Sequence, residues 1–326
     1  MNVGIPGEDR DPLPPRPGKG QAVKWLLAAV GAFFAYLFVQ IVAAVVVGVA
    51  LLTTDVDILM FAATAGNLAL AVLWWLHLRP RALMRCGEER PSRPARIALL
   101  ACVLFALGLV LQVTLSCVLT LVLPLFPEVM DAYLELMELA GISGEMDIAT
   151  FVEAAVVAPI AEEAICRGVM LEFCLRAVCP ELQGIWLQRG DGERPAARPM
   201  VSSRRFWVAN AIQALLFAIM HLNVVQGVYA FALGMLLGWI VRRTGGLRAA
   251  ILLHMAVNGA SALMDVLDPL LGGAFVPVLL VGGVLSAVLV WAVARLTDEG
   301  PSEDGMTGGG PAEEGPAKEL PAGERL

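Results

Sequence analysis

Residues 25–52 read WLLAAVGAFFAYLFVQIVAAVVVGVALL, a run without a single charged side chain. A helix needs about 20 apolar residues to cross the hydrocarbon core of a bilayer. A backbone placed in lipid must satisfy its own hydrogen bonds, and a helix does so within one segment. The run is also far longer than the apolar region of a signal peptide, so it predicts a membrane-spanning helix.

Further apolar runs of this kind follow along the 326-residue chain, of which 58% of the residues are hydrophobic and 16% are charged. Soluble domains average about 25% charged residues, so the composition favours a membrane protein. We expect an all-α fold, a polytopic membrane helix bundle of about eight transmembrane helices. The expected spans are residues 23–52, 57–78, 96–123, 149–178, 206–222, 224–241, 248–267 and 275–296.

The connections between these spans alternate in charge. Arg and Lys collect in the N-terminal arm and in the second, fourth and sixth connections, whereas Asp and Glu collect in the first, third and seventh. Cytoplasmic connections of membrane proteins are enriched in Lys and Arg. The alternation therefore predicts that both termini are cytoplasmic, and the expected location is the plasma (inner) membrane of a bacterial cell.

The chain is expected to divide into five parts. Residues 1–20 and 298–326, rich in Pro and Gly, predict a flexible arm and a disordered tail. The parts between them are 21–148, with the first three helices, 149–267, with the fourth to seventh helices, and 268–297, the last transmembrane helix. Within the first of these, 124–144 is amphipathic and acidic, which predicts a helix along the outer membrane interface. The six cysteines contain no CxxC pair, so they are expected to be small buried hydrophobes.

Charged residues inside a membrane helix are costly and usually face a functional interior. The expected fourth span reads EEAICR at residues 162–167. Glu163 and Arg167 are one helical turn apart in the favourable order, which predicts a structural ion pair. Glu162 points about 100° away and has Cys166 one turn later, so it is the carboxylate without a cation. Alternatively, Glu162 bonds a neighbouring helix.

Two of the three histidines lie on polar stripes of membrane helices. The first stripe ends in His221, and the second begins with His254. The stripes comprise Asn210, Gln213, Phe217 and His221 in the fifth span, and His254, Asn258, Ser261 and Asp265 in the seventh. The third histidine, His77, lies at the basic end of the second span, where an interfacial role is expected.

The motifs EExxxR (162–167), FxxxH (217–221) and HxxxN (254–258), in this order on three apolar helices, resemble the CPBP family of CAAX proteases and bacteriocin-processing enzymes. The resemblance covers residues 149–267 and implies an intramembrane glutamate-dependent endopeptidase. It implies Glu162 as the general base, His221 as a holder of the attacking water, and His254 and Asn258 as stabilisers of the oxyanion.

Glu163, Arg167 and Phe217 are then supporting residues, and no cofactor or metal is expected. A zinc version would use Glu162, His221 and His254 as ligands, although the chain lacks an HExxH motif. The expected partners are a protein or peptide substrate and the lipid bilayer. Nucleic acid is not an expected partner, because no basic cluster is interleaved with aromatic residues. A non-catalytic scaffold or self-immunity protein of the same fold is the alternative, followed by a transporter.

Overall fold

The computed structural model describes residues 19–79, 94–139, 147–179, 201–261 and 273–298, with a few positions between 262 and 272. Most of the predicted N-terminal arm and C-terminal tail therefore lies outside the described residues, as do Cys86, Asp265 and Asp268. The described elements are helices, and none of the described residues forms a strand.

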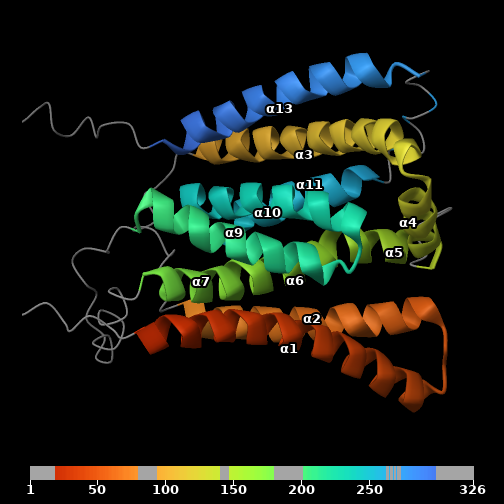
Figure 1. The fold of residues 1–326 in the computed structure, drawn as a ribbon, viewed down its shortest axis with the longest axis vertical. Helices are drawn as coiled ribbons and strands as arrows, with labels where there is room; N and C mark the ends of the chain where they lie inside the picture. The colour runs from red at the N-terminus through yellow and green to blue at the C-terminus, as the bar shows by residue number, and fades with distance from the viewer. Residues whose placement is uncertain are drawn as a thin grey trace, which may run out of the picture.

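The described residues form eight helical columns, which run side by side (Figure 1). The columns are α1 (Lys19–Leu51), α2 (Val56–Leu78), α3 (Pro94–Val122), the composite α5 to α7, α9 (Ser203–Met220), α10 (Val224–Thr244), α11 (Leu247–Ser261) and α13 (Phe275–Thr297). The composite column joins α5 (Ile148–Val152), η3 (Glu153–Val157), α6 (Ala158–Glu163), η4 (Ala164–Met170) and α7 (Leu171–Val178). These bounds agree with the predicted spans within a few residues, except that residues 262–267 of the seventh span are largely undescribed.

Two shorter helices stand apart from the columns. The 3₁₀ turn η2 (Leu123–Leu125) leads into α4 (Pro127–Leu139). Figure 1 shows α4 lying across one end of the bundle, at a steep angle to the other helices. This is the orientation expected of an interfacial helix, as predicted for the acidic segment.

Five of the columns are long and apolar enough to cross a membrane. They are Gly20–Leu51, Val56–Leu78, Pro94–Leu125, Val224–Thr244 and Phe275–Thr297. The predicted all-α polytopic bundle is thus confirmed, whereas the number of eight spans stays a prediction. Of the other columns, α9 begins with two arginines, α11 is described for only 15 residues, and the composite column changes its winding.

The outer helices expose large apolar side chains, and the composite column is buried. Phe34 and Phe38 of α1 are 60% and 66% exposed, and Leu280 and Val284 of α13 are 67% and 65% exposed. By contrast, residues 163–176 are buried throughout. An exposed apolar belt around a buried column that carries two Glu–Arg ion pairs is the arrangement expected of a bundle surrounded by lipid.

The helix ends on the acidic side are defined by caps. Asp55 accepts hydrogen bonds from the first backbone N–H groups of α2, and Asn223 does the same for α10. Asp147 caps α5, and the backbone N–H of Thr150, which donates to it, lowers the pKa of the Asp147 carboxyl. The turn from α9 to α10 passes through Leu222 at φ 53°, which lets the chain reverse directly after His221.

Glycines allow the helices around the composite column to approach closely. Gly234 and Gly238 of α10 face Ala214 and Asn210 of α9. Gly108 of α3 similarly lies against α11. A side chain added at any of these glycines would meet the neighbouring helix at less than normal contact distance. These contacts fix the positions of α9, α10 and α11 around the two glutamates.

Candidate active site

The adjacent glutamates lie on a column that changes its winding twice. α6, which ends at Glu163, is preceded by the π-helical turn η3 and followed by the π-helical turn η4. A π turn hydrogen-bonds from i to i+5, which changes the direction of the side chains that follow it, and such turns are frequent at functional sites. The spacing of apolar residues does not indicate these two turns.

Glu163 and Arg167 form the predicted ion pair. Arg167 Nη1 donates to Glu163 Oε1 at 2.7 Å, and both side chains are fully buried. The guanidinium carbon of Arg167 also lies 4.4 Å from the centre of the Phe217 ring, a favourable contact between a cation and an aromatic face. Arg167 thus links the composite column to α9, and the predicted ion pair is present, whereas its structural role stays a prediction.

Glu163 has a second partner that sequence reasoning missed. His254 Nδ1 of α11 lies 2.9 Å from the same Glu163 Oε1 atom. The side chain of His254 is only 3% exposed, so this contact is shielded from solvent. The i to i+4 spacing indicates partners within a helix, but it carries no information about a histidine 91 residues away. The sequence contains only one indication of this contact: Glu163 and His254 are both polar residues expected inside a membrane bundle.

Glu162 lies on the other side of the same imidazole. Its Oε2 atom is 3.7 Å from His254 Nε2, and its side chain is 20% exposed. Tyr36 of α1, which is 6% exposed, is close enough to interact electrostatically with Glu162. Among the described residues, Glu162 makes no ion pair with Arg or Lys. It is therefore the carboxylate without a neighbouring cation, as predicted.

Phe217 connects the two histidines. Its ring centre is 4.8 Å from that of His221 and 5.9 Å from that of His254, both in edge-to-face geometry. His221 caps the end of α9, and its Nδ1 lies 2.9 Å from the Phe217 carbonyl oxygen. Within the described part of the chain, the His221 ring makes no hydrogen bond to Glu162 or His254. The structure thus brings His221 to the site, but the Phe217 ring lies between His221 and His254.

Asn258 lies one turn after His254 on α11. Its Nδ2 donates to the carbonyl oxygen of Ala154 in η3 at 3.0 Å, and the residue is partly buried. One amide hydrogen thus anchors α11 to the composite column. The second amide hydrogen makes no described bond and is available to another acceptor.

The rest of the polar stripe on α9 has a structural role. Asn210 Nδ2 donates to the Met235 carbonyl oxygen at 2.9 Å, and Gln213 Nε2 donates to Asn210 Oδ1 at 2.9 Å and to the Gly234 carbonyl oxygen at 3.2 Å. The bonds to the carbonyl oxygens of Met235 and Gly234 join α9 to α10 across their close contact. At the end of the stripe, Phe217 contacts Arg167 and His254, and His221 lies beside Phe217.

Several polar atoms of the site retain capacity for hydrogen bonds. Glu163 Oε2, Arg167 Nε and Arg167 Nη2 are buried, and they have no hydrogen-bond partner among the described residues. Buried polar atoms are nearly always satisfied by protein or by ordered water. The centre of the bundle is therefore a strongly polar region that can interact with water or with polar groups of a ligand.

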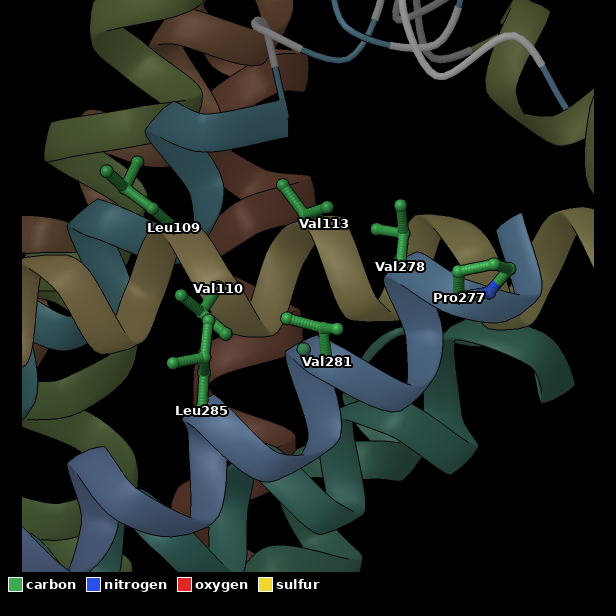
Figure 2. A pocket seen from close by; sticks show the side chains of 8 residues that line it. Leu109, Val110, Val113, Pro277, Val278, Val281 and Leu285 are labelled. Carbon is green, nitrogen blue, oxygen red and sulfur yellow. The ribbon is translucent and has the colours of Figure 1, made fainter. Parts of the chain in front are cut away.

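Neither a described metal cluster nor a described cavity coincides with this region. The described residues contain no group of three His, Cys, Asp or Glu side chains placed to hold one metal ion. A cavity of about 350 Å³ lies between α3 and α13, lined by apolar residues (Figure 2). The lining residues are Leu109, Val110, Val113, Pro277, Val278, Val281, Gly282 and Leu285. This cavity offers no side chain for acid, base or nucleophilic chemistry, so the polar cluster is the better candidate site.

The polar cluster lies within a segment that matches a known family. Residues 144–260 match the Rce1-like family of type II CAAX prenyl endopeptidases. The resemblance to CAAX proteases predicted from the three motifs is thereby confirmed. The match covers slightly more than a third of the chain, and this Rce1-like segment contains all the predicted site residues. Comparison with curated proteins and with solved structures found no match.

Proposed function

We propose that this protein is an intramembrane endopeptidase in which Glu162 activates a water molecule to hydrolyse a peptide bond. The observation that carries the proposal is the contrast between the two adjacent glutamates. Glu163 is fully buried and paired with Arg167, whereas Glu162 has no Arg or Lys beside it among the described residues and is partly exposed. A carboxylate left free next to a histidine is suited to accept a proton from water.

The other motif residues supply the remaining groups that peptide hydrolysis needs. His254 and Asn258, one turn apart on α11, stabilise the negative oxygen of the tetrahedral intermediate. Two donors on one helix face can point at one oxygen, and such donors act strongly in a site that excludes water. His221 helps to hold the attacking water. This water would lie between His221 and His254, whose rings are separated by the Phe217 ring.

The substrate class follows from the family and the location of the site. A protease of the Rce1-like family acts on a protein or peptide, and a site within a helical bundle favours substrates held at the membrane. The family description names CAAX prenyl endopeptidases, so a peptide with a prenylated C-terminal CAAX sequence is the first substrate to test. An unmodified peptide of the same sequence tests whether the prenyl group is needed.

The metal-free mechanism and the zinc alternative make different demands on the site. Zinc would need Glu162, His221 and His254 around one ion, with a fourth position open to water. In the structure the side chains of Glu162, His221 and His254 are not placed to hold one ion, and the His221 ring packs against Phe217. We therefore propose that the reaction needs no metal or other cofactor.

Hydrolysis by the purified full-length protein in lipid nanodiscs tests this function. Prenylated and unmodified CAAX peptides are incubated in water enriched in ¹⁸O, and the products are analysed by mass spectrometry. We expect cleavage with one ¹⁸O atom in the new carboxyl group and no effect of chelators. Loss of activity with a chelator and its recovery with zinc would contradict the metal-free mechanism. Absence of any cleavage, in peptides and in a pool of membrane proteins, would favour the non-catalytic scaffold instead.

A further inference from the structure

The imidazole of His254 lies between two carboxylates of different character. Its Nδ1 is 2.9 Å from Glu163 Oε1, and its Nε2 is 3.7 Å from Glu162 Oε2. The first contact is a hydrogen bond by distance and is buried on both sides. The second is longer than a hydrogen bond and lies at the partly exposed glutamate. The two ring nitrogens are thus in distinct environments, which decides how each can act.

The proton on the ring can be assigned from the partners of Glu163. Glu163 forms an ion pair with Arg167, whose Nη1 donates to the Glu163 Oε1 atom at 2.7 Å. An ionised carboxylate only accepts hydrogen bonds, so His254 Nδ1 must carry the hydrogen that lies between them. A neutral imidazole has only one N–H, and its Nε2 is then an acceptor that faces Glu162.

We propose that Glu163, held by Arg167, is a positioning residue that fixes the orientation and tautomer of His254. In the resting enzyme Nδ1 carries the hydrogen, and Nε2 faces Glu162 without one. This goes beyond a structural ion pair, because the carboxylate determines which ring nitrogen meets the substrate. The catalytic consequence rests on the proposed peptidase function, whereas the tautomer itself does not.

This tautomer defines a path for the proton that water releases. Water gives one proton to Glu162 while its oxygen bonds to the carbonyl carbon of the substrate. The proton then passes from Glu162 to His254 Nε2, a step for which the 3.7 Å gap must shorten on substrate binding. The resulting Nε2–H donates to the oxyanion. When the C–N bond breaks, the proton passes to the amine nitrogen, and His254 returns to its neutral form.

Nuclear magnetic resonance of the full-length protein with ¹⁵N-labelled histidine tests the tautomer directly. The chain contains only three histidines, so the signals are assigned by replacing His77 and His221 in turn. At neutral pH we expect His254 to show a protonated Nδ1 and an unprotonated Nε2. A hydrogen on Nε2, either alone or together with one on Nδ1, would overturn the proposal.

The role of Glu163 is tested with a variant that removes the whole ion pair. Glu163→Met/Arg167→Met takes away the acceptor without leaving an unpaired buried charge, so the protein is expected to fold. The matched control is Glu172→Met/Arg176→Met, which removes the other buried i to i+4 pair on this column, at 2.8 Å. We expect the first variant to lose the fixed Nδ1–H signal and the control to keep it. An unchanged signal in the first variant would overturn the proposal.

A kinetic measurement separates this proposal from the proposed function. Removal of the carboxylate that orients a serine-protease histidine lowers kcat by roughly 10,000-fold. We expect the Glu163 variant to lose kcat on the order of 100-fold or more with little change in KM, and the control to keep its activity. If kcat is retained while the tautomer changes, Glu163 does not position a catalytic group. If the wild-type protein has the expected tautomer but hydrolyses nothing, only the peptidase function fails.

Discussion

The Oε1 atom of Glu163 accepts hydrogen bonds from Arg167 on its own column and from His254 on α11. Glu163 therefore contacts both its ion-pair partner Arg167 and the proposed catalytic residue His254. Glu162, one position earlier in the chain, makes no ion pair with Arg or Lys among the described residues and is 20% exposed. The two glutamates have different surroundings because adjacent side chains of a helix point about 100° apart. Their surroundings decide the chemistry available to each.

Loss of Arg167 alone should destabilise the bundle strongly. Arg167→Met leaves the Glu163 charge buried and removes the contact with Phe217, and breaking a buried pair in this way costs about 3–5 kcal/mol. Thermal unfolding in detergent measures the loss. The double variant Glu163→Met/Arg167→Met should recover much of it. Equal unfolding temperatures for Arg167→Met and the wild type would show that the pair has no structural role.

At the scale of single residues, the sequence predicted only what lies within one helix. The i to i+4 rule found the Glu163–Arg167 pair, and the motifs named His221, His254 and Asn258. The bonds of His254 to Glu163 and of Asn258 to Ala154 join α11 to the composite column across long sequence separations. Such contacts depend on tertiary packing, and helical periodicity does not predict which residues of different helices meet.

At the scale of elements, hydrophobic run length located the helices well, because a bilayer imposes a minimum length on each apolar segment. The π turns at η3 and η4 escaped prediction, since they change the hydrogen-bond pattern without changing the apolar composition. They lie on either side of the glutamates. The length of an apolar run therefore cannot predict η3 and η4, the two elements on either side of the site glutamates.

The contact of α9 with α10 should depend on Gly238. A Cβ atom at this position would overlap Asn210 Oδ1, which accepts the hydrogen bond from Gln213. Gly238→Ala should therefore destabilise the protein by about 1–3 kcal/mol, the usual cost of overpacking. Gly283→Ala on α13 is the control, because a Cβ there has no neighbour within 4 Å. Unfolding of both variants in detergent would show equal stability if the close contact were unimportant.

The start of α5 should respond to acid through Asp147. The backbone N–H of Thr150 donates to this carboxylate and lowers its pKa below the ordinary value of 3.8. Because the pKa is lowered in the folded state, the ionised cap stabilises the helix fully above the ordinary value of 3.8. This stabilisation is lost as the pH falls through the lowered pKa. Hydrogen exchange at Thr150, corrected for its intrinsic rate, should therefore lose protection only in strong acid.

Asp147→Asn is the control for this effect, because an amide oxygen still caps the helix but does not titrate. Protection in this variant should be independent of pH over the same range. The same acid-induced loss in both proteins would show that another group is responsible.

At the scale of the whole molecule, the arrangement of the columns fits the predicted topology. The ends of α2, α7 and α10 lie on the same side as the starts of α3, α9 and α11, and the first connection lies on the opposite side with α4 (Figure 1). The described helix ends that border the basic connections of the sequence therefore lie on one side of the bundle, and the acidic first connection and α4 lie on the other. Composition predicted this separation because lipid and membrane charge act on whole segments.

Cysteine labelling in intact cells tests the predicted orientation. In a cysteine-free background, Thr54→Cys reports the first connection and Ser202→Cys reports the start of α9, and both residues are exposed. A membrane-impermeant maleimide should label Thr54→Cys in intact cells, and Ser202→Cys only after lysis. The reverse pattern would contradict cytoplasmic termini, and labelling of both from outside would contradict the membrane topology.

The central claim is that Glu162 is the catalytic base, and the kcat/KM of Glu162→Gln tests it most directly. Glutamine keeps the size of the side chain but cannot accept a proton from water, and loss of a general base costs roughly 100–10,000-fold in rate. The purified variant is compared with the wild type and with Glu172→Met/Arg176→Met on the same cleaved peptide, after its fold has been verified by thermal unfolding. The account predicts a loss of this size in Glu162→Gln alone. Full activity in a folded Glu162→Gln protein would contradict it.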